Sequence, residues 1–361
     1  MNTNKILHVL FFIILAFSTR SYANEIGNMA ISSDKQWLAL SYADFSIKIY
    51  SLENGQVLQT LKGHSDEAYS MDFNIDGTRL ISTDGDGTAI LWDLKSGEMI
   101  NQKSLSGMLV DSYFSANNNI VLFFDEKAAQ VYNSKLKKII KTLSVGGDIH
   151  VSDDKRFLLG VMRNREGVRE GVEVIDLSNN GSIMELKPVD AHDDHIVFNH
   201  DKSIVVVRDW DYFHFWNIEN KRKIGVIKST SRVDSFALRD GTDELWIASD
   251  NQIEVWNFIT QKMEKRILLT EMDVDEVKSI SFSKDNTKIA MTFELESKRD
   301  QSKVVLLDAQ TNAVKSILEP SRKQYVFEAI FLDNDRILMS SSYPQEVWST
   351  GEAKKLFSIE G

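Results

Sequence analysis

The sequence predicts an all-β fold built from repeated units, and three observations lead to this prediction. A unit of about 40 residues recurs along the chain, a period typical of stacked supersecondary units. Every unit carries a polar turn after a short apolar strand, and every unit carries an aromatic or aliphatic residue that closes a later strand. No segment after Ala23 shows a helical period with caps.

The polar turn is the first landmark and occurs eight times. Asp, Asn and Gly in such turns supply side-chain caps and left-handed backbone angles for a tight reversal. The eight turns are Ile31-Ser32-Ser33-Asp34, Phe73-Asn74-Ile75-Asp76-Gly77, Phe114-Ser115-Ala116-Asn117, Val151-Ser152-Asp153-Asp154, Phe198-Asn199-His200-Asp201, Leu238-Arg239-Asp240-Gly241, Phe282-Ser283-Lys284-Asp285 and Phe331-Leu332-Asp333-Asn334.

The second landmark closes the third strand of each unit and also occurs eight times. Its spacings along the chain are 42, 40, 43, 41, 40, 51 and 41 residues. The closing residues are Tyr50, Trp92, Tyr132, Ile175, Trp216, Trp256, Leu307 and Trp348. The two landmarks agree on eight units, and each unit has room for four strands.

Several of these strands are apolar on both faces, as in Ile204-Val205-Val206-Val207. Both faces of such a strand must be covered. Radial stacking of four-stranded antiparallel sheets does this, because each sheet packs against two neighbours. We therefore expect a β-propeller with eight blades over residues 24–361.

The second unit carries the resemblance to a known family. Gly63-His64 is followed by the segment RLISTDGDGTAILWD from Arg79 to Asp93, which closely resembles a WD repeat. In that family four polar side chains form a structural hydrogen-bonded chain. The resemblance implies that they are His64, Ser82, Asp86 and Trp92 in this sequence. Imidazole can donate to a carboxylate and accept from a hydroxyl, which is consistent with such a chain.

The other units keep the order of strands and turns but lose most of these polar residues. The resemblance covers residues 26–359 at the level of strand and turn order. Many rings of the WD-repeat family have seven blades, so seven is the alternative to eight. Little chain precedes the first unit, so we expect the ring to close by packing between blades 8 and 1.

The N-terminal segment resembles a secretory signal peptide. Lys5 precedes the apolar run Ile6 to Phe17, and Ser21-Tyr22-Ala23 places small residues where a signal peptidase cleaves, before Asn24. We expect residues 1–23 to be removed. The apolar run is short for a membrane span, so the alternative of an uncleaved anchor is disfavoured and no stable membrane insertion is expected after cleavage.

Charge and cysteine content narrow the partners and the compartment. Cleavage removes Lys5 and Arg20, which leaves 40 basic and 53 acidic side chains and a net charge of −13. Such a surface repels phosphate backbones, so nucleic acid is not an expected partner. There is no cysteine, which excludes disulfides and thiolate sites. An exported chain without disulfides suits a bacterial periplasm, with secretion to the exterior as the alternative.

Two constellations could suggest chemistry, and each has a simpler interpretation. His64, Ser82 and Asp86 resemble a hydrolase triad, but the family pattern makes them a structural element inside a blade. Asp190, His192, Asp193, Asp194, His195 and His200 form the densest metal-like cluster, although such spacing in loops often arises by chance. We therefore expect no catalytic residue, no bound metal and no cofactor.

One rim of the propeller carries the candidate partner-binding residues. The connections between second and third strands emerge there, and they are long and charged at 163–172 and 293–303. In unit 5 the same connection carries aromatic residues. The candidates are Trp210, Tyr212, Arg163, Arg165, Arg169, Lys298 and Arg299. Exposed Trp, Tyr and Arg are enriched in binding hot spots. The alternative is that the loops are solvated insertions and the aromatic rings fold over the channel mouth.

The sequence favours a binding scaffold for a protein or peptide over an enzyme. It contains no glycine-rich phosphate loop and no Gly-x-Ser-x-Gly turn. The alternative function is an extracytoplasmic propeller enzyme, a hydrolase, lactonase or dehydrogenase, with its site in the central channel. Fold alone does not separate the two.

Overall fold

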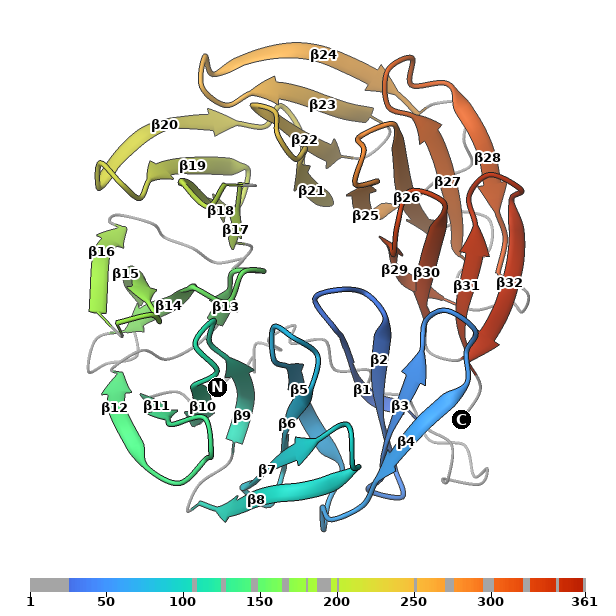
Figure 1. Cartoon of the computed structure of the whole chain (residues 1–361). Helices are drawn as coiled ribbons and strands as arrows, with labels where there is room; N and C mark the ends of the chain where they lie inside the picture. The colour runs from blue at the N-terminus through green and yellow to red at the C-terminus, as the bar shows by residue number, and fades with distance from the viewer. Residues whose placement is uncertain are drawn as a thin grey trace, which may run out of the picture.

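The structure is a computed structural model that describes residues 26–105, 109–124, 128–143, 149–163, 169–179, 181–186, 196–199, 201–249, 252–269, 276–294, 302–320, 325–341 and 344–359. Within these ranges the chain forms 32 strands and no helix. They make eight four-stranded antiparallel sheets arranged in a ring (Figure 1). The predicted β-propeller with eight blades is confirmed, and seven blades is excluded.

The first four blades use consecutive strands. Blade 1 holds β1 (Ile26–Ile31), β2 (Trp37–Tyr42), β3 (Ile47–Ser51) and β4 (Val57–Leu61). Blade 2 holds β5 (Ala68–Phe73), β6 (Arg79–Asp84), β7 (Thr88–Asp93) and β8 (Glu98–Ser104). Blade 3 holds β9 (Leu109–Phe114), β10 (Ile120–Phe124), β11 (Ala128–Tyr132) and β12 (Ile139–Leu143). Blade 4 holds β13 (Ile149–Val151), β14 (Phe157–Arg163), β15 (Arg169–Asp176) and β16 (Gly181–Leu186).

The last four blades follow the same order. Blade 5 holds β17 (Ile196–Phe198), β18 (Ile204–Asp209), β19 (Tyr212–Asn217) and β20 (Arg222–Lys228). Blade 6 holds β21 (Ser235–Leu238), β22 (Glu244–Ser249), β23 (Gln252–Asn257) and β24 (Lys262–Leu268). Blade 7 holds β25 (Glu276–Phe282), β26 (Lys288–Glu294), β27 (Ser302–Asp308) and β28 (Val314–Leu318). Blade 8 holds β29 (Val326–Phe331), β30 (Arg336–Ser341), β31 (Gln345–Ser349) and β32 (Lys354–Ile359).

We call the four strands of each blade a to d, from the channel outward. Because consecutive strands are antiparallel, the a–b and c–d turns lie on one side of the ring, which we call the a–b face. The b–c turns and the connections between blades lie on the other side, the b–c face. In Figure 1 the a–b turns surround the central opening.

The polar landmark caps the a–b turn in blades 1, 2, 4, 5, 7 and 8. Its first polar residue accepts a hydrogen bond from the backbone N–H that begins strand b, as Asn74 Oδ1 does from Arg79 at 2.8 Å and Ser152 Oγ does from Phe157 at 2.9 Å. The turn also needs a left-handed residue, which is Gly77 in blade 2 and Lys155 in blade 4. These local bonds explain why Ser, Asn, Asp and Gly recur at the landmark.

Eight hydrophobic clusters fill the eight gaps between neighbouring blades. Alternate residues of one strand face opposite neighbours, so Val205 and Val207 pack toward blade 4 while Ile204 and Val206 pack toward blade 6. Each large aliphatic side chain buried in this way contributes about 1.5–3 kcal/mol. This arrangement explains the strands that are apolar on both faces.

The ring closes by the same kind of packing. Leu38 and Leu40 of blade 1 share a buried cluster with Leu338 and Val347 of blade 8. Blade 8 is completed by its own fourth strand, β32. The predicted closure by packing between blades 8 and 1 is therefore confirmed.

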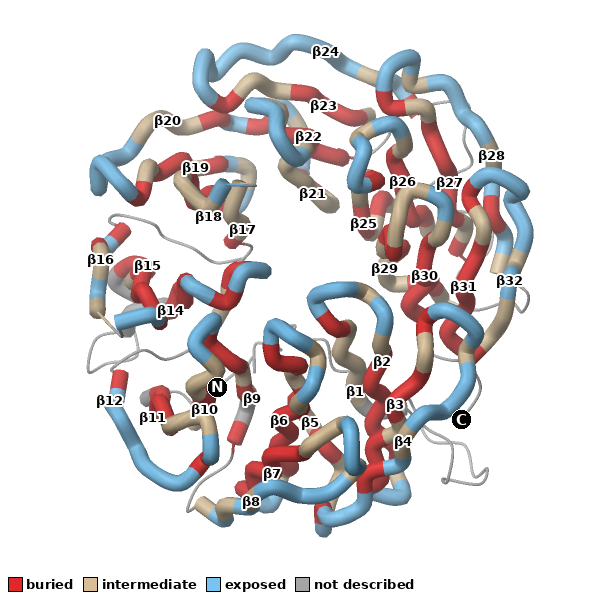
Figure 2. Tube along the Cα trace, in the orientation of Figure 1, coloured by how far each residue is buried: buried red, intermediate tan, exposed pale blue. Residues whose placement is uncertain are grey.

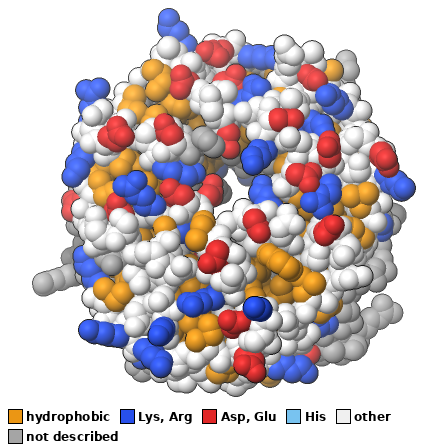
Figure 3. All heavy atoms as spheres, in the orientation of Figure 1, with side chains coloured by type: hydrophobic (Ala, Val, Ile, Leu, Met, Phe, Trp, Pro, Cys, Tyr) orange, Lys and Arg blue, Asp and Glu red, His pale blue; other side chains and the backbone are white. Residues whose placement is uncertain are grey.

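Exposure is lowest in the middle strands of the blades and highest in the outermost strands. Figure 2 shows exposed residues along outer strands such as β8, β12 and β24, and buried residues along the middle strands. Figure 3 shows an opening at the centre of the ring with charged side chains around it. In the part of the chain that the structure describes, no helix has the length and apolar character to cross a membrane.

Candidate functional site

Blade 2 contains a buried chain of polar side chains. Ser82 and Asp84 lie two residues apart on β6 and therefore face the same side of the strand. His64 lies between them, with Nδ1 2.8 Å from Asp84 Oδ2 and Nε2 2.6 Å from Ser82 Oγ. The indole N–H of Trp92 donates to Ser82 Oγ at 2.8 Å. The structure thus brings together His64, Ser82 and Trp92 as the sequence predicted.

The carboxylate in this chain is Asp84, and the prediction of Asp86 was wrong by two residues. Strand β6 continues to Asp84, which is fully buried and also accepts the backbone N–H of Thr88 at 2.8 Å. The chain then reverses at Gly87, which has φ +80°. The reversal carries Asp86 to the surface, where it accepts a hydrogen bond from the Ser65 hydroxyl at 3.2 Å.

The hydrogen bonds of the buried chain require a neutral imidazole at His64. Burial lowers the pKa of His64, although the neighbouring Asp84 acts in the opposite direction. Neutral His64 donates from Nδ1 to the carboxylate and accepts the Ser82 hydroxyl proton at Nε2. Because Ser82 is fully buried and also accepts the Trp92 N–H, its hydroxyl does not face a substrate. The constellation holds blade 2 together and does not form a hydrolase triad.

Blade 5 displays two aromatic side chains on the b–c face. Trp210 is 57% exposed and Tyr212 is 40% exposed. Trp210 and Asp211 form a two-residue turn between β18 and β19, and Trp210 has φ +54°. Glycine is the usual residue at a left-handed position in such a turn. The alternative that these rings fold away over the channel mouth does not fit their exposure.

The backbone of this turn is held from two sides. The buried guanidinium of Arg208 donates from Nε to the Trp210 carbonyl at 2.9 Å and from Nη2 to the Val233 carbonyl at 2.8 Å. The Ser229 N–H donates to the Asp211 carbonyl at 2.8 Å. Trp210 is therefore presented by a rigid turn.

A third aromatic side chain on the b–c face was missed by sequence reasoning. Phe45 lies in the b–c turn of blade 1, is 42% exposed and has φ +67°. It occupies the position of Gly87 in blade 2. Aligning Asp44-Phe45-Ser46 with Asp86-Gly87-Thr88 would have revealed it. Blades 1 and 5 are four apart in a ring of eight, so Phe45 and Trp210 lie on opposite sides of the channel mouth.

Only part of the predicted charged rim falls within the described residues. The backbones of Arg163 and Arg169 are register partners at the ends of β14 and β15, on the b–c face and one blade from Trp210. Arg165, Lys298 and Arg299 lie outside the described residues. The candidate metal ligands Asp190, His192, Asp193, Asp194, His195 and His200 also lie outside them. Among the described residues no group of three His, Asp or Glu side chains could hold a metal ion.

Comparisons with known proteins agree with this reading of blade 2. Residues 55–93 match the model of the family "WD domain, G-beta repeat". An uncharacterized WD repeat-containing protein of Synechocystis is 36% identical over 87 residues, which are 24% of this chain and 25% of that protein. WD repeat-containing protein 91 of Xenopus tropicalis is 26% identical over 169 residues, 45% of this chain and 22% of that protein. The chain thus spans about a quarter of the length of these relatives.

A solved structure extends the similarity from one repeat to the whole ring. Saccharomyces cerevisiae Sqt1 superposes with a TM-score of 0.67 over 94% of this chain and 97% of that chain, at 11% identity. At that identity the likeness shows the fold alone. The chain is thus an eight-bladed β-propeller whose second blade is similar to the WD-repeat family at residues 55–93.

Proposed function

We propose that this chain is a scaffold that binds a protein or peptide on its b–c face, with Trp210 and Tyr212 as anchors. WD-repeat propellers are typically protein-interaction scaffolds. The observation that carries the proposal is an exposed tryptophan in a left-handed conformation on a braced turn. A non-glycine residue there costs about 1–2 kcal/mol. Because the ring is more than half exposed, we assign its value to recognition.

The physical character of the surface supports this role. Trp and Tyr provide large, stiff contact areas and are enriched in hot spots. The turn that carries them is rigid, so a partner would spend little entropy on ordering it. The ammonium of Lys228 lies over the Tyr212 ring, 5.1 Å from its centroid, and fixes that ring as well. Arg163 and Arg169 begin the neighbouring part of the same rim.

The experiment is photo-crosslinking in native cells, comparing wild type with Trp210→Ala. We expect the variant to lose the main crosslinked partner and to remain folded. Ile259→Ala is the matched control, because Ile259 is 45% exposed but lies in a c–d turn on the opposite face. If Trp210→Ala retained every crosslink, or if Ile259→Ala lost the same ones, the chosen face would be wrong.

We also propose that the scaffold works outside the cytoplasm, in the periplasm or, alternatively, secreted. The support is the signal-like segment at residues 1–23, together with the acidic, cysteine-free chain that follows. N-terminal sequencing of the protein from the extracytoplasmic fraction is the test. We expect the mature chain to start at Asn24. An intact Met1 in a cytoplasmic fraction would contradict the proposal.

A further inference from the structure

In blades 2, 7 and 8 the residue that begins strand b is a cation that links neighbouring blades on the a–b face. Arg79 donates from Nη1 to the Ser134 carbonyl at 3.1 Å, across the gap from blade 2 to blade 3. Arg336 donates from Nη1 to the Leu52 carbonyl at 2.8 Å, from blade 8 to blade 1. Both acceptors lie in the c–d turn of the next blade. A cation at this position therefore acts as a bridge between blades.

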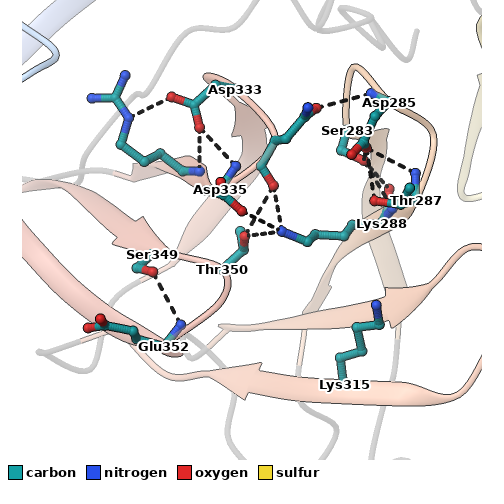
Figure 4. A network of polar contacts seen from close by, with 12 residues as sticks. Ser283, Asp285, Thr287, Lys288, Lys315, Asp333, Asp335, Ser349, Thr350 and Glu352 are labelled. Atoms are coloured by element: carbon teal, nitrogen blue, oxygen red, sulfur yellow. Dashed lines mark hydrogen bonds and ion pairs between the residues drawn. The ribbon is translucent and has the colours of Figure 1, made fainter.

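Figure 4 shows the same bridge between blades 7 and 8. Lys288 donates from Nζ to the Asn334 carbonyl at 2.6 Å and to the Thr350 hydroxyl at 3.0 Å, and it pairs with Asp335 at 2.9 Å. Thr350 again belongs to the c–d turn of the next blade. The ammonium thus fills the space between the two blades with a charge and satisfies three oxygen atoms.

Blade 6 breaks this pattern, because its strand b begins with an acidic residue. In the other blades the equivalent position holds one of the three cations, an apolar side chain (Trp37, Phe157 or Ile204) or, in blade 3, Asn119. Glu244 cannot donate to the c–d turn of blade 7. Instead its Oε2 accepts hydrogen bonds from Arg239 Nη1 at 3.1 Å and from the Trp246 indole at 2.9 Å.

An open groove of about 800 Å³ lies where the bridge is missing, between blades 6 and 7. Glu244 and Trp246 line it from blade 6, and Asn286, Asp308 and Asn312 line it from blade 7. Among the described residues, the side-chain oxygens of Asn286 and Asn312 have no hydrogen-bond partner. A buried oxygen atom without a hydrogen bond costs free energy, so these two oxygen atoms favour binding of a group that can donate one.

Three cations line the groove, and one of them, Arg239, already reaches blade 7. Arg239 spends Nη2 on the Asn286 carbonyl at 3.0 Å, in the a–b turn of blade 7, and Nη1 on Glu244. Lys315 is paired with Asp308 at 2.9 Å. Lys265, on the outer strand β24, is exposed to solvent. Among the described residues that line the groove from blade 7, the buried acceptors that stay open are therefore the side-chain oxygens of Asn286 and Asn312.

We infer that this groove receives a lysine or arginine side chain of a partner peptide. That side chain would occupy the position that Arg79, Lys288 and Arg336 occupy within the chain. Its N–H groups would reach the Glu244 carboxylate and the amide oxygens of blade 7, and hydrogen bonds of this charge-assisted kind are the strong ones. The groove lies on the a–b face, opposite Trp210, so it is a second site that does not depend on the function proposed above.

The test uses the whole mature chain and capped pentapeptides Gly-Gly-Arg-Gly-Gly and Gly-Gly-Gln-Gly-Gly as probes. The indole N–H of Trp246 donates to Glu244, so its ¹H–¹⁵N resonance reports on the groove. We expect a saturable shift of this resonance with the arginine peptide and none with the glutamine peptide. Glu244→Lys, which would place a cation in the groove from within the chain, should abolish the shift.

The control variant is Glu53→Lys, which makes the same charge change in the exposed c–d turn of blade 1. It should leave the Trp246 shift intact, which separates recognition in the groove from general attraction to an acidic protein. An unmoved Trp246 resonance would overturn the inference. Equal shifts with both peptides, or an equal shift in folded Glu244→Lys, would overturn it as well, because the cation or the groove would then not be what the peptide recognises.

Discussion

The b–c hairpins of blades 2 and 5 occupy the same place in the repeat but differ in what they bury and what they expose. In blade 2 the Trp92 indole donates to Ser82, within the buried chain that ends at Asp84. In blade 5 the matching tryptophan is Trp216, and Val207 stands where Ser82 does. The Trp216 indole N–H therefore has no hydrogen-bond partner among the described residues.

The difference teaches how one repeat position can serve either the fold or recognition. Blade 2 reverses through Gly87, whose left-handed angle is free of strain. Blade 5 reverses through Trp210, which is strained and exposed. Blade 5 loses the internal polar chain and gains a rigid aromatic surface on the b–c face. Exposed residues that strain the backbone of a blade, such as Trp210, are therefore the residues to test for binding.

The largest effect is expected from deleting the central histidine of blade 2. His64→Ala removes a donor from the buried Asp84 carboxylate and an acceptor from Ser82, so the free energy of unfolding should fall by about 3 kcal/mol. His214→Ala removes the same residue type from strand c of blade 5. The His214 ring nitrogens make no hydrogen bond among the described residues, so this change should cost only about 1 kcal/mol. Urea unfolding of both variants gives the comparison, and equal losses would refute it.

The next effect separates the two aspartates of the blade 2 turn. Asp84→Asn keeps the size of the side chain but removes the charge and one acceptor from a site with two donors, so it should cost about 2 kcal/mol. Asp86→Asn changes an exposed residue and should alter stability by less than about 0.5 kcal/mol. Thermal unfolding measures both. A larger loss of stability for Asp86→Asn than for Asp84→Asn would indicate that Asp86 is the partner of His64, as the sequence predicted.

The pH dependence of stability should distinguish blade 5 by its buried histidine. Burial, with a contribution from Lys223, lowers the pKa of His214 from 6.5 to about 4. As pH falls from 6.5 toward 4, the unfolded chain takes up a proton that the folded chain refuses, so stability is lost in this window. His214→Leu should reduce that slope by up to about 1.4 kcal/mol per pH unit. Identical slopes for both proteins would show that His214 does not titrate in this way.

Asp111 does not disturb this comparison, although it titrates in the same window. Burial raises its pKa to about 6, so the folded chain holds a proton there that the unfolded chain releases. Its contribution to stability therefore has the opposite sign, increasing as pH falls. Because Asp111 is present in wild type and in His214→Leu, its contribution cancels in the difference between the two slopes.

The fold was predictable because its signals are local and repeat eight times. The capped a–b turns, such as the one at Asn74, and the strands that are apolar on both faces are visible in the sequence itself. The register at the end of β6 was not visible. Asp84 and Asp86 have the same side chain and the same parity, and only the point of chain reversal decides which one meets His64.

The candidate sites were predictable only where a residue type was unusual for its turn. Trp210 stands out in the sequence because tryptophan is rare in a tight reversal. Phe45 escaped because its turn is one of several eroded copies, and its left-handed angle appears only in three dimensions. The groove at Glu244 was not predicted because it depends on a missing contact between neighbouring blades. Where such a contact exists, as in the bond from Lys288 to Thr350, it joins residues more than 60 positions apart in the sequence.

The smallest effect is also the one that joins stability to function in blade 5. Trp210→Gly should raise the free energy of unfolding by about 1 kcal/mol relative to Trp210→Ala, because glycine adopts a φ of +54° without strain and alanine does not. Both variants lack the ring, so both should lose the partner in the crosslinking assay. Phe45→Gly against Phe45→Ala repeats the comparison in blade 1 at φ +67°. If the glycine variants gained no stability, the aromatic residues would carry no strain, and their exposure alone would remain as the reason to place recognition on the b–c face.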